Sequence, residues 1–493
     1  MDVPGESKPR PLARNLVSEI GVVVAIIAIA NLIFLIFVDL TVTHENPYLG
    51  ILAYVVVPGF LSLGILLFIG GILLERRRRN RLGTVSQFPD INLNVPRTRY
   101  ITYVSVVAGI FFFLISILGS YRAYHYTESD AFCGTTCHTV MHPEYTAYKA
   151  SPHSRVGCVG CHVGSGAGWY VKSKISGSRQ LYSVLFKKYS KPIPTPVHNM
   201  RPARDTCEQC HTPGKFFGDQ LKVFTRYAYD ETNTKHETRM LIKVGGGSAA
   251  TGLVSGIHWH MYNQNEITYA ASDEKRQTIE WVRMRNRQTG QTTEYRAKDS
   301  KLDAKALESA PKRVMDCIDC HNRPTHIYVP PDRAIDTAML AGRIDPSLPF
   351  IKQQAVDALT KDYKSTPEAV QAIDKGIRDY YSSKYASVYG AKRASVDRAI
   401  ATAQQIFQTI RFPEMNVDWR SHPDNIGHFY FTGCFRCHDN QHVSSDGKVI
   451  SNDCHICHEV LSATSATATF EHPVDIGDLR EVKCGDCHTG ASM

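Results

Sequence analysis

No cysteine in this chain stands alone. All 14 cysteines fall into seven pairs, and a histidine follows the second cysteine of every pair. A redox-active C-x-x-C would not recur seven times without leaving a spare thiol. A zinc site would reuse paired cysteines but would not need a histidine directly after each second one. The pattern therefore argues against thioredoxin-like redox pairs and against zinc.

Acidic residues are missing from residues 163–204, which carry eight lysines and arginines. Aromatic residues and leucines are interleaved with these cations, as in segments that lie on a membrane surface. A solvated basic face is the alternative. The chain also lacks the composition of a disordered protein, because 43% of its 493 residues are hydrophobic. A chain of this length has about two to four domains.

Three long runs lack any charged side chain, namely residues 20–38, 49–74 and 100–121. Each is long enough to cross about 30 Å of hydrocarbon as a helix that rises about 1.5 Å per residue. A cleaved signal peptide is the alternative for the first run. It is disfavoured because no small-residue cleavage site follows Val38 and two further runs come after it. We therefore expect three transmembrane helices.

Lysine and arginine are shared unevenly among the segments that flank these runs. Residues 1–15 carry three and the loop 75–99 carries seven, including positions 76–79, whereas the loop 39–48 carries none. Because positive residues stay in the cytoplasm, we expect a cytoplasmic N-terminus and a periplasmic location for everything after residue 121. The inside segments hold ten basic and four acidic residues, which accounts for +6 of the net charge of +9. Charge therefore gives no case for nucleic-acid binding.

The seven cysteine pairs match the attachment motif of c-type heme. Two thiols must reach the two vinyl groups on one porphyrin edge, and the next residue must place an imidazole on the iron. Six pairs have the regular C-x-x-C-H spacing. The first has one extra residue, C-x-x-x-C-H, which we expect to alter the loop and the axial geometry at that heme. In chain order the motifs are Cys133/Cys137/His138 (motif 1), Cys158/Cys161/His162 (motif 2), Cys207/Cys210/His211 (motif 3), Cys317/Cys320/His321 (motif 4), Cys434/Cys437/His438 (motif 5), Cys454/Cys457/His458 (motif 6) and Cys484/Cys487/His488 (motif 7).

Fourteen histidines lie outside the motifs, and seven irons need at most seven distal ligands. Met141 or His142, close behind motif 1, is a candidate ligand of the first heme. Methionine would raise the potential of that heme relative to two histidines, and a weak or absent ligand would leave it open to a quinol. The predicted distal ligands are His153, His198, His260, His326, His428, His442 and His472, with His236, His258, His422 and His455 as alternatives.

The segments between the motifs give a coarse organisation. Residues 279–287 and 291–297 alternate around Gln288-Thr289-Gly290, which predicts a hairpin. Residues 350–411 predict helices, with Ser365 and Glu368 as a capping box. The fold class we expect is a membrane anchor of three transmembrane helices plus a periplasmic multiheme cytochrome c domain, mostly α and irregular with a small β insertion. The segments are a cytoplasmic N-terminus at 1–15, the anchor at 16–121, a domain with hemes 1–3 at 122–217, a β-rich insertion at 218–300, the heme 4 region at 301–349, a helical spacer at 350–411 and a cluster of hemes 5–7 at 412–493.

Residues 100–212 resemble the NapC/NirT family of membrane-anchored multiheme quinol dehydrogenases. The likeness rests on a membrane helix that leads into Cys133-Gly-Thr-Thr-Cys137-His138, then Met141, Ser151-Pro-His153, motif 2, Trp169, Lys174, His198-Asn-Met and motif 3. The resemblance implies that menaquinol or ubiquinol is oxidised near the first heme. It implies that Met141 is an axial ligand and that Lys174 contacts the quinol. Relatives place a carboxylate soon after that lysine, and residues 163–204 have none, so the proton acceptor stays open.

Typical members of the family have one anchor helix and four hemes. With three expected spans and seven motifs, the larger architecture resembles the seven-heme inner-membrane cytochromes of metal-respiring bacteria. That likeness implies electron delivery to periplasmic c-type cytochromes or a reductase, in anaerobic and extracellular respiration. The expected location is the bacterial inner membrane, and the expected partners are the quinone pool and the lipid bilayer.

Two other functions stay open at this point. One is a terminal reductase with an open heme, which the supply of spare histidines and the lack of a C-x-x-C-K motif disfavour. The other is a quinone reductase that runs in the reverse direction, because heme order does not fix the direction of flow. A subunit that wires a tightly bound catalytic partner to the quinone pool differs from the first reading only in requiring a stable complex.

Overall fold

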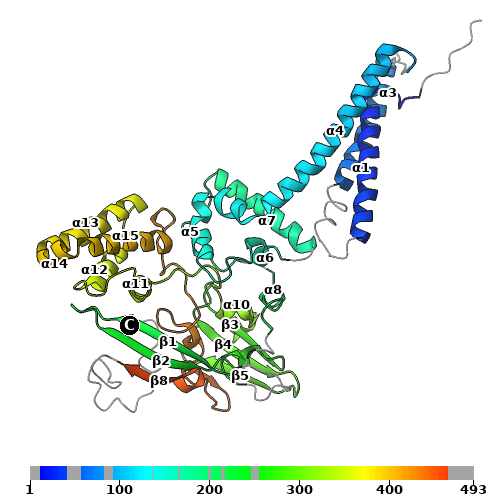
Figure 1. Cartoon of the computed structure of the whole chain (residues 1–493). Coiled ribbons are helices and arrows are strands. Elements are labelled where there is room, and N and C mark those ends of the chain that lie inside the picture. Colours follow the sequence, from blue (N-terminus) through cyan, green and yellow to red (C-terminus); the bar gives the residue numbers. More distant parts are fainter. Residues whose placement is uncertain are drawn as a thin grey trace, which may run out of the picture. The chain divides into compact units, whose positions relative to one another are not determined.

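The computed structural model describes residues 11–41, 57–82, 93–136, 138–164, 167–197, 201–212, 216, 218–245 and 255–464. The chain divides into two compact units (Figure 1). The first comprises Met1–Glu128 with Val163–Arg179, and the second comprises Ser129–His162 with Gln180–Met493.

The first unit contains long apolar helices. They are α1 (Leu16–Thr41), α3 (Val57–Leu82) and α4 (Pro96–Thr127), and α7 (Ala167–Leu185) begins in this unit. Two of them, at Leu16–Phe34 and Val57–Arg81, are long and apolar enough to cross a membrane. The third predicted run lies inside α4, a single helix of 32 residues, and its crossing stays a prediction.

The connection between the second and third apolar helices is shorter than the predicted loop 75–99. Helix α3 continues through the arginine run to Leu82, and α4 begins at Pro96. Arginine has a high helix propensity, and Glu75 pairs with Arg79 one turn later at 3.0 Å. Hydrophobicity therefore ends before the helix does.

Helices α1 and α3 approach each other through small residues. An ideal Cβ on Gly21 would lie 2.5 Å from the Phe68 nitrogen, and one on Gly64 would lie 2.8 Å from the Ala25 nitrogen. The Ser18 hydroxyl donates to the Phe68 carbonyl across the same interface at 3.0 Å. Glycine is required here because any side chain would push the two backbones apart, which is how helices pack tightly within a membrane.

We expect Gly64→Ala to loosen this helix pair, because its methyl group would collide with the α1 backbone, at a cost of about 1–3 kcal/mol. Gly70→Ala is the matched control, since a Cβ at Gly70 meets nothing within 4 Å on the same helix. Thermal unfolding of the detergent-solubilised protein, followed by far-UV circular dichroism, should show a lower midpoint for Gly64→Ala alone. Equal midpoints would contradict the close packing.

The second unit contains two antiparallel sheets. The larger has the strand order β6-β3-β4-β5-β7 and the smaller has the order β1-β2-β8. The predicted hairpin is present as β4 and β5, and Gly290 takes a positive φ of 75° in its turn. The strands are β1 (Gln220–Tyr227), β2 (Lys235–Ile242), β3 (Asn265–Ala271), β4 (Ile279–Asn286), β5 (Thr292–Ala297), β6 (Arg313–Val314), β7 (His442–Ser444) and β8 (His458–Thr464).

Both sheets reach beyond the residues 218–300 that the sequence suggested as an insertion. Strands β6, β7 and β8 all come from later in the chain, and β8 directly follows the cysteines of motif 6. An open sheet edge needs a partner, and these short strands supply one for β2, β3 and β5. The sheets therefore join motifs 4 to 6 to the insertion.

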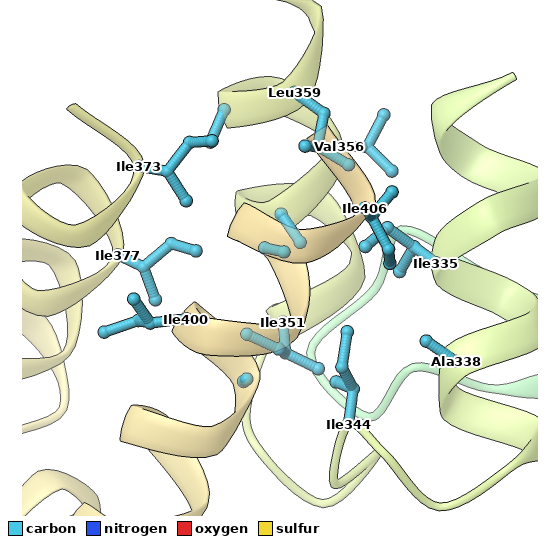
Figure 2. Close-up of a cluster of buried hydrophobic side chains, with 14 of the residues drawn as sticks. Ile335, Ala338, Ile344, Ile351, Val356, Leu359, Ile373, Ile377, Ile400 and Ile406 are labelled. Carbon is cyan, nitrogen blue, oxygen red and sulfur yellow. The ribbon is translucent and has the colours of Figure 1, made fainter. Parts of the chain in front are cut away.

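A helical module without motif cysteines follows motif 4. It comprises α11 (Pro331–Leu340), α12 (Ile351–Thr360), α13 (Thr366–Lys384), α14 (Ala386–Ala391) and α15 (Arg393–Ile410), of which α11 precedes the predicted range 350–411. Its core side chains point inward from α11, α12, α13 and α15 (Figure 2). Ser365 caps α13 by accepting from the Glu368 nitrogen at 3.4 Å, while the Glu368 carboxylate accepts from the Lys364 nitrogen. Helix α11 was missed because Pro330-Pro331 predicts a turn, yet proline also suits the first helical position.

A buried ion pair fastens this module to β1. The Lys352 ammonium lies 2.8 Å from an Asp336 carboxylate oxygen, and both side chains are 5% exposed or less. The same oxygen accepts from the Tyr227 nitrogen at 3.1 Å, and Lys352 donates to the Tyr227 carbonyl. Burial raises the pKa of Asp336, although Lys352 opposes that shift. The ionised form of the Asp336 carboxylate is therefore stabilised by the Lys352 ammonium.

Removing only the cation should be costly. We expect Lys352→Met to destabilise the chain by about 3–5 kcal/mol, because it leaves Asp336 buried without a positive partner. The double variant Lys352→Met/Asp336→Leu should recover much of that loss. Urea titration followed by far-UV circular dichroism measures both, and a double variant no more stable than Lys352→Met would contradict the pairing.

Short helical turns carry most of the motifs and complete the second unit. They are η2 (Phe132–Thr136), α5 (His138–Lys149), α6 (Cys158–His162), α8 (Ala203–Cys207), η4 (Ile257–Met261), α9 (Ala304–Ser309), α10 (Cys317–Cys320), η5 (Pro413–Met415), η6 (Gly433–Arg436) and η7 (Cys454–Ile456).

Candidate heme-attachment sites

In motifs 3, 4 and 5 the chain from the first cysteine to the histidine forms a single turn. The histidine N–H donates to the carbonyl of the first cysteine in motifs 3, 4 and 5, at 2.8, 2.8 and 3.1 Å. This bond closes one turn, so both cysteines and the histidine emerge close together. The C-x-x-C-H spacing thus converts three sequence positions into one attachment platform.

Motif 1 accommodates its extra residue in a wider turn. Residues 132–136 form a five-residue π-type turn, in which an insertion is taken up locally. Gly134 is buried there, and an ideal Cβ on it would lie 2.1 Å from the Tyr145 ring. Cys137 and the His138 side chain lie outside the described residues.

In motif 3 the two predicted attachment cysteines differ in their surroundings. Cys210 is exposed, whereas Cys207 is partly buried, as are the other motif cysteines of the described part of the chain. The difference arises because α8 ends at Cys207, and Cys210 lies in the turn beyond it, where its N–H donates to the Cys207 carbonyl at 3.1 Å. Cys207 is also the cysteine through which motif 3 interacts with Cys161 and Cys317. Heme attachment at Cys210 therefore stays a prediction from the motif spacing, because the exposed position of its thiol gives no further support.

Motif 7 has no described residue, since Cys484, Cys487 and His488 all lie beyond the last described position, 464. The predicted distal ligands His198 and His472 also lie outside the described residues. Attachment of a seventh heme through Cys484 and Cys487, with His488 on its iron, therefore stays a prediction from the C-x-x-C-H spacing.

A carboxylate joins the turn before motif 1 to motif 2. Asp130 accepts from the Cys158 nitrogen at 2.9 Å and from the Tyr148 hydroxyl at 2.8 Å. Burial alone would raise the pKa of Asp130, but the hydrogen bonds from Cys158 and Tyr148 outweigh it and lower that pKa. Asp130 is therefore an ionised anchor for the start of motif 2.

Motif 4 carries a buried aspartate between its cysteines. Asp319 is 3% exposed and accepts from Tyr269, Arg276 and Arg313 at 2.8, 3.2 and 2.7 Å. It also completes a capping box with Asp316 at the start of α10. Two guanidinium groups thus offset the cost of burying this carboxylate. Sequence reasoning missed Asp319, although a charged residue inside C-x-x-C was visible.

Five motif histidines each face one histidine from outside the motifs. The centroids of the two rings lie 5.8–6.2 Å apart in every pair, while the angle between ring planes varies from 4° to 84°. The pairs are His162 with His326, His211 with His153, His321 with His258, His438 with His260, and His458 with His428.

These distances fit one metal atom between two imidazoles. Metal–nitrogen bonds of about 2 Å, with each nitrogen about 1.1 Å from its ring centre, place the two centroids about 6 Å apart at any ring angle. Ordinary aromatic packing is the alternative, but its centroid separations range over about 4.5–7 Å and depend on the ring angle. A nearly constant separation across such different angles therefore favours ligation of a shared iron.

Hydrogen bonds at Nδ1 orient four of the ten paired rings at 3.0 Å or less. The Nδ1 of His258, His260, His326 and His438 lies 3.0, 2.7, 3.0 and 2.9 Å from a backbone carbonyl. A carbonyl only accepts, so Nδ1 carries the proton and Nε2 keeps the lone pair that a metal requires. Burial also lowers the pKa of these four imidazoles, which favours the neutral form that binds iron.

Not every predicted distal ligand is placed at a motif. His442 is 1% exposed, and its Nδ1 and Nε2 lie 2.9 and 3.0 Å from Asp439 and the Ile279 carbonyl. Because Nε2 must donate to that carbonyl, His442 has no nitrogen for iron in this structure. His258, which the sequence reading held as an alternative, is instead one of the five histidines that face a motif histidine.

The remaining candidates belong to none of the five pairs. His422 contacts Thr195 through Nδ1 at 3.1 Å and stacks near Tyr328, and burial lowers its pKa to about 4. His236 lies on β2, and His455 contacts Asp453 at 3.1 Å. Met141 and His142 lie on α5, where His142 packs edge-on against Phe412. Lys174 lies on α7, and its side chain is outside the described residues.

Successive motifs lie side by side in chain order. The Cys158 thiol interacts with that of Cys133, and the Cys317 thiol with that of Cys207, which raises the pKa of both Cys158 and Cys317. Electrostatic contacts likewise link Cys161 to Cys207, Cys320 to Cys434, and Cys457 to Cys434. Motifs 1 to 6 therefore form one continuous row.

Comparison with known proteins identifies the family of the chain. Residues 95–193 match the N-terminal region of the NapC/NirT cytochrome c family. The chain is also 43% identical over 488 residues to the cytochrome c-type protein ImcH of Geobacter sulfurreducens, covering 97% of this chain and 96% of the relative. The chain belongs to the NapC/NirT cytochrome c family. Membership indicates c-type heme and a membrane-anchored protein of electron transport, and no solved structure matches the chain.

Because members of the NapC/NirT family carry c-type heme, the predicted ligation of iron by histidine can be tested by visible absorption. We expect His326→Leu to remove one low-spin heme signal, because the iron at motif 2 loses its second imidazole. His442→Gln is the matched control, a buried histidine whose nitrogens already contact protein atoms. The measurement is the high-spin ferric absorption of the oxidised protein. A high-spin signal in His442→Gln, or none in His326→Leu, would contradict the pairing.

Proposed function

We propose that the protein is an inner-membrane quinol dehydrogenase that carries seven c-type hemes. It oxidises menaquinol or a related quinol and passes electrons along its hemes to a periplasmic cytochrome or reductase. The observation that carries this proposal is the row of motifs 1 to 6, in which five motif histidines face a second histidine at ligand distance. Irons with two histidines transfer electrons and have no open position for a substrate.

The first heme is the exception that suits a quinol. His138 and Met141 lie three residues apart on α5, hence on the same face of that helix. Two such residues approach a porphyrin from one side, so they are alternative ligands of one face of the heme. The opposite face then depends on a residue from elsewhere in the chain or stays open near the membrane.

Helix α7 has the composition of a helix at the membrane surface. Val171, Ile175, Tyr182 and Phe186 are exposed and recur at spacings of four, seven and four residues along α7 and the turn after it. Lysines and arginines occupy other positions, and Lys172 lies 4.4 Å above the Trp169 ring. Exposed apolar residues in one stripe with cations beside them suit the boundary between lipid and water. Lys174 on this helix is the residue we assign to the quinol oxygen.

The proposed reaction divides between the cofactors and the chain. The hemes accept electrons one at a time, and the protein supplies ligands, spacing and electrostatics. The two quinol protons leave toward the periplasm. Because 163–204 contains no carboxylate, their acceptor lies elsewhere in the chain or is water. The same row of motifs would serve flow in the reverse direction.

The test is reduction by a menaquinol analogue, followed by visible absorption on the full-length solubilised protein. We expect Lys174→Ala to slow reduction about tenfold or more, because a hydrogen bond to a charged group is worth about 1.5–3 kcal/mol. Lys172→Ala is the matched control, since it removes the same charge from the same helix. Dithionite should reduce all variants fully.

Each outcome separates two claims. Equal slowing in both lysine variants would mean that charge on α7, and not a contact of Lys174, supports quinol oxidation. Fast reduction in all variants would keep the function and move the site. Failure of every quinol to reduce a dithionite-reducible wild type would exclude the dehydrogenase and direct assays to a terminal reductase.

A further inference from the structure

One short turn carries two of the five distal histidines. Helix η4, at Ile257–Met261, contains His258 and His260, and they face histidines of different motifs. The centroid of His258 lies 6.1 Å from that of His321 in motif 4. The centroid of His260 lies 5.8 Å from that of His438 in motif 5. A single turn therefore reaches two neighbouring attachment sites.

The turn is held by the backbone that follows β2. Ile257 and His258 donate their N–H groups to the carbonyls of Lys243 and Val244 at 2.9 and 3.1 Å. Asn265 donates to the Trp259 carbonyl at 2.8 Å from the start of β3. These bonds fix the turn from both sides, so the two imidazoles are positioned by a rigid support.

The side chains are oriented as well. His258 donates from Nδ1 to the Val244 carbonyl at 3.0 Å, and His260 donates to the Ile257 carbonyl at 2.7 Å. Both rings therefore keep Nε2 free as a lone-pair donor. Phe216 packs on the His258 ring at 4.6 Å, and Trp259 packs edge-on against His260.

Motifs 4 and 5 are also joined on the side of their cysteines. Arg436, between the cysteines of motif 5, donates to the Asp319 carbonyl of motif 4 at 2.8 Å. The same guanidinium donates to the Arg276 carbonyl at 3.0 Å. The two attachment turns are thus bound to each other independently of the histidine turn.

We propose that the turn 257–261 is a two-heme clamp that supplies the distal ligands of both heme 4 and heme 5. This inference rests on the proposed function only in taking motifs 4 and 5 to carry heme. Because Arg436 adds a separate bond between motifs 4 and 5, the clamp holds the two hemes as one rigid pair. Neither histidine belongs to the residues 95–193 that match the family, so the clamp belongs to the later part of the chain.

The two ligand pairs differ in orientation, which gives each heme its own spectrum. The rings of His258 and His321 are nearly parallel, at 4°, whereas those of His260 and His438 are nearly perpendicular, at 84°. Axial imidazoles with parallel planes split the two iron d orbitals that interact with them, and imidazoles with perpendicular planes leave these orbitals nearly equal in energy. Oxidised heme 4 should therefore give an ordinary rhombic low-spin EPR signal, and heme 5 a highly anisotropic one.

Gly256 is the positioning residue of the clamp. It precedes the turn with a φ of +77°, and an ideal Cβ on it would lie 2.6 Å from the Lys243 carbonyl, the acceptor of the Ile257 N–H. A side chain here would strain the backbone and displace the turn. Gly290 is a matched control, since its φ is +75° and nothing lies within 4 Å of its Cβ position.

The experiment is EPR of the oxidised full-length protein, with total heme measured in each variant. His258→Leu should convert a rhombic signal into a high-spin one, and His260→Leu should do the same to a highly anisotropic signal. Gly256→Ala should disturb both signals together, and Gly290→Ala neither. Covalent heme content should stay at the wild-type value, because the cysteines are unchanged.

Three results would overturn the clamp. They are an unchanged spectrum in either histidine variant, loss of the same signal in both, or equal effects of Gly256→Ala and Gly290→Ala. Quinol oxidation is scored separately, from the initial rate of heme reduction by the menaquinol analogue. If the clamp is wrong, the EPR changes are absent while the initial rates stay at the wild-type value. If the quinol function is wrong, the EPR changes occur but quinol does not reduce the hemes.

Discussion

Each attachment motif supplies one histidine, whereas an iron that only transfers electrons needs a second axial ligand, histidine or methionine, from the opposite side. The second histidine comes from elsewhere in the chain in all five described pairs, as His326 does for motif 2 and His428 for motif 6. This requirement ties distant segments together. The histidine pairs therefore link distant segments of the second unit, and the strands β6, β7 and β8 complete its two sheets.

Where no motif is present, the chain uses an ordinary core. The helical module at 331–410 buries isoleucine, leucine and alanine side chains from four of its helices, and the buried ion pair of Lys352 and Asp336 binds it to β1. Attachment turns contain few apolar residues by contrast, and they rely on Asp130, Asp319 and Arg436 for their hydrogen bonds. Polar bonds position the attachment sites because the space beside them must accept a large planar ligand.

The sequence predicts what is local and misses what depends on long-range pairing. The seven motifs, the β4–β5 hairpin and the helices after residue 350 follow from spacing and periodicity, and the first two apolar runs form helices long enough to span a membrane. The choice of His258 over His442 does not follow, because neither residue type nor spacing in the sequence distinguishes the two histidines. Only the fold shows that a carbonyl occupies Nε2 of His442 and that Nδ1 of His258 is the bonded nitrogen. Strands β6 and β7 were not predicted, because a strand of two or three residues shows no alternation of polar and apolar residues.

The two longest interruptions of the motif series fall between motifs 3 and 4 and between motifs 4 and 5, yet these neighbours stay in contact. Cys207 contacts Cys317, and Arg436 of motif 5 donates to the Asp319 carbonyl of motif 4, across insertions that form the sheets and the helical module. Closing a long loop costs little more entropy than closing a short one, since the cost rises only with the logarithm of length. An insertion can thus add a rigid element beside the row without separating its members. The turn 257–261 shows the benefit. It belongs to the insertion between motifs 3 and 4, and it holds motifs 4 and 5 together although a second insertion separates them in the sequence.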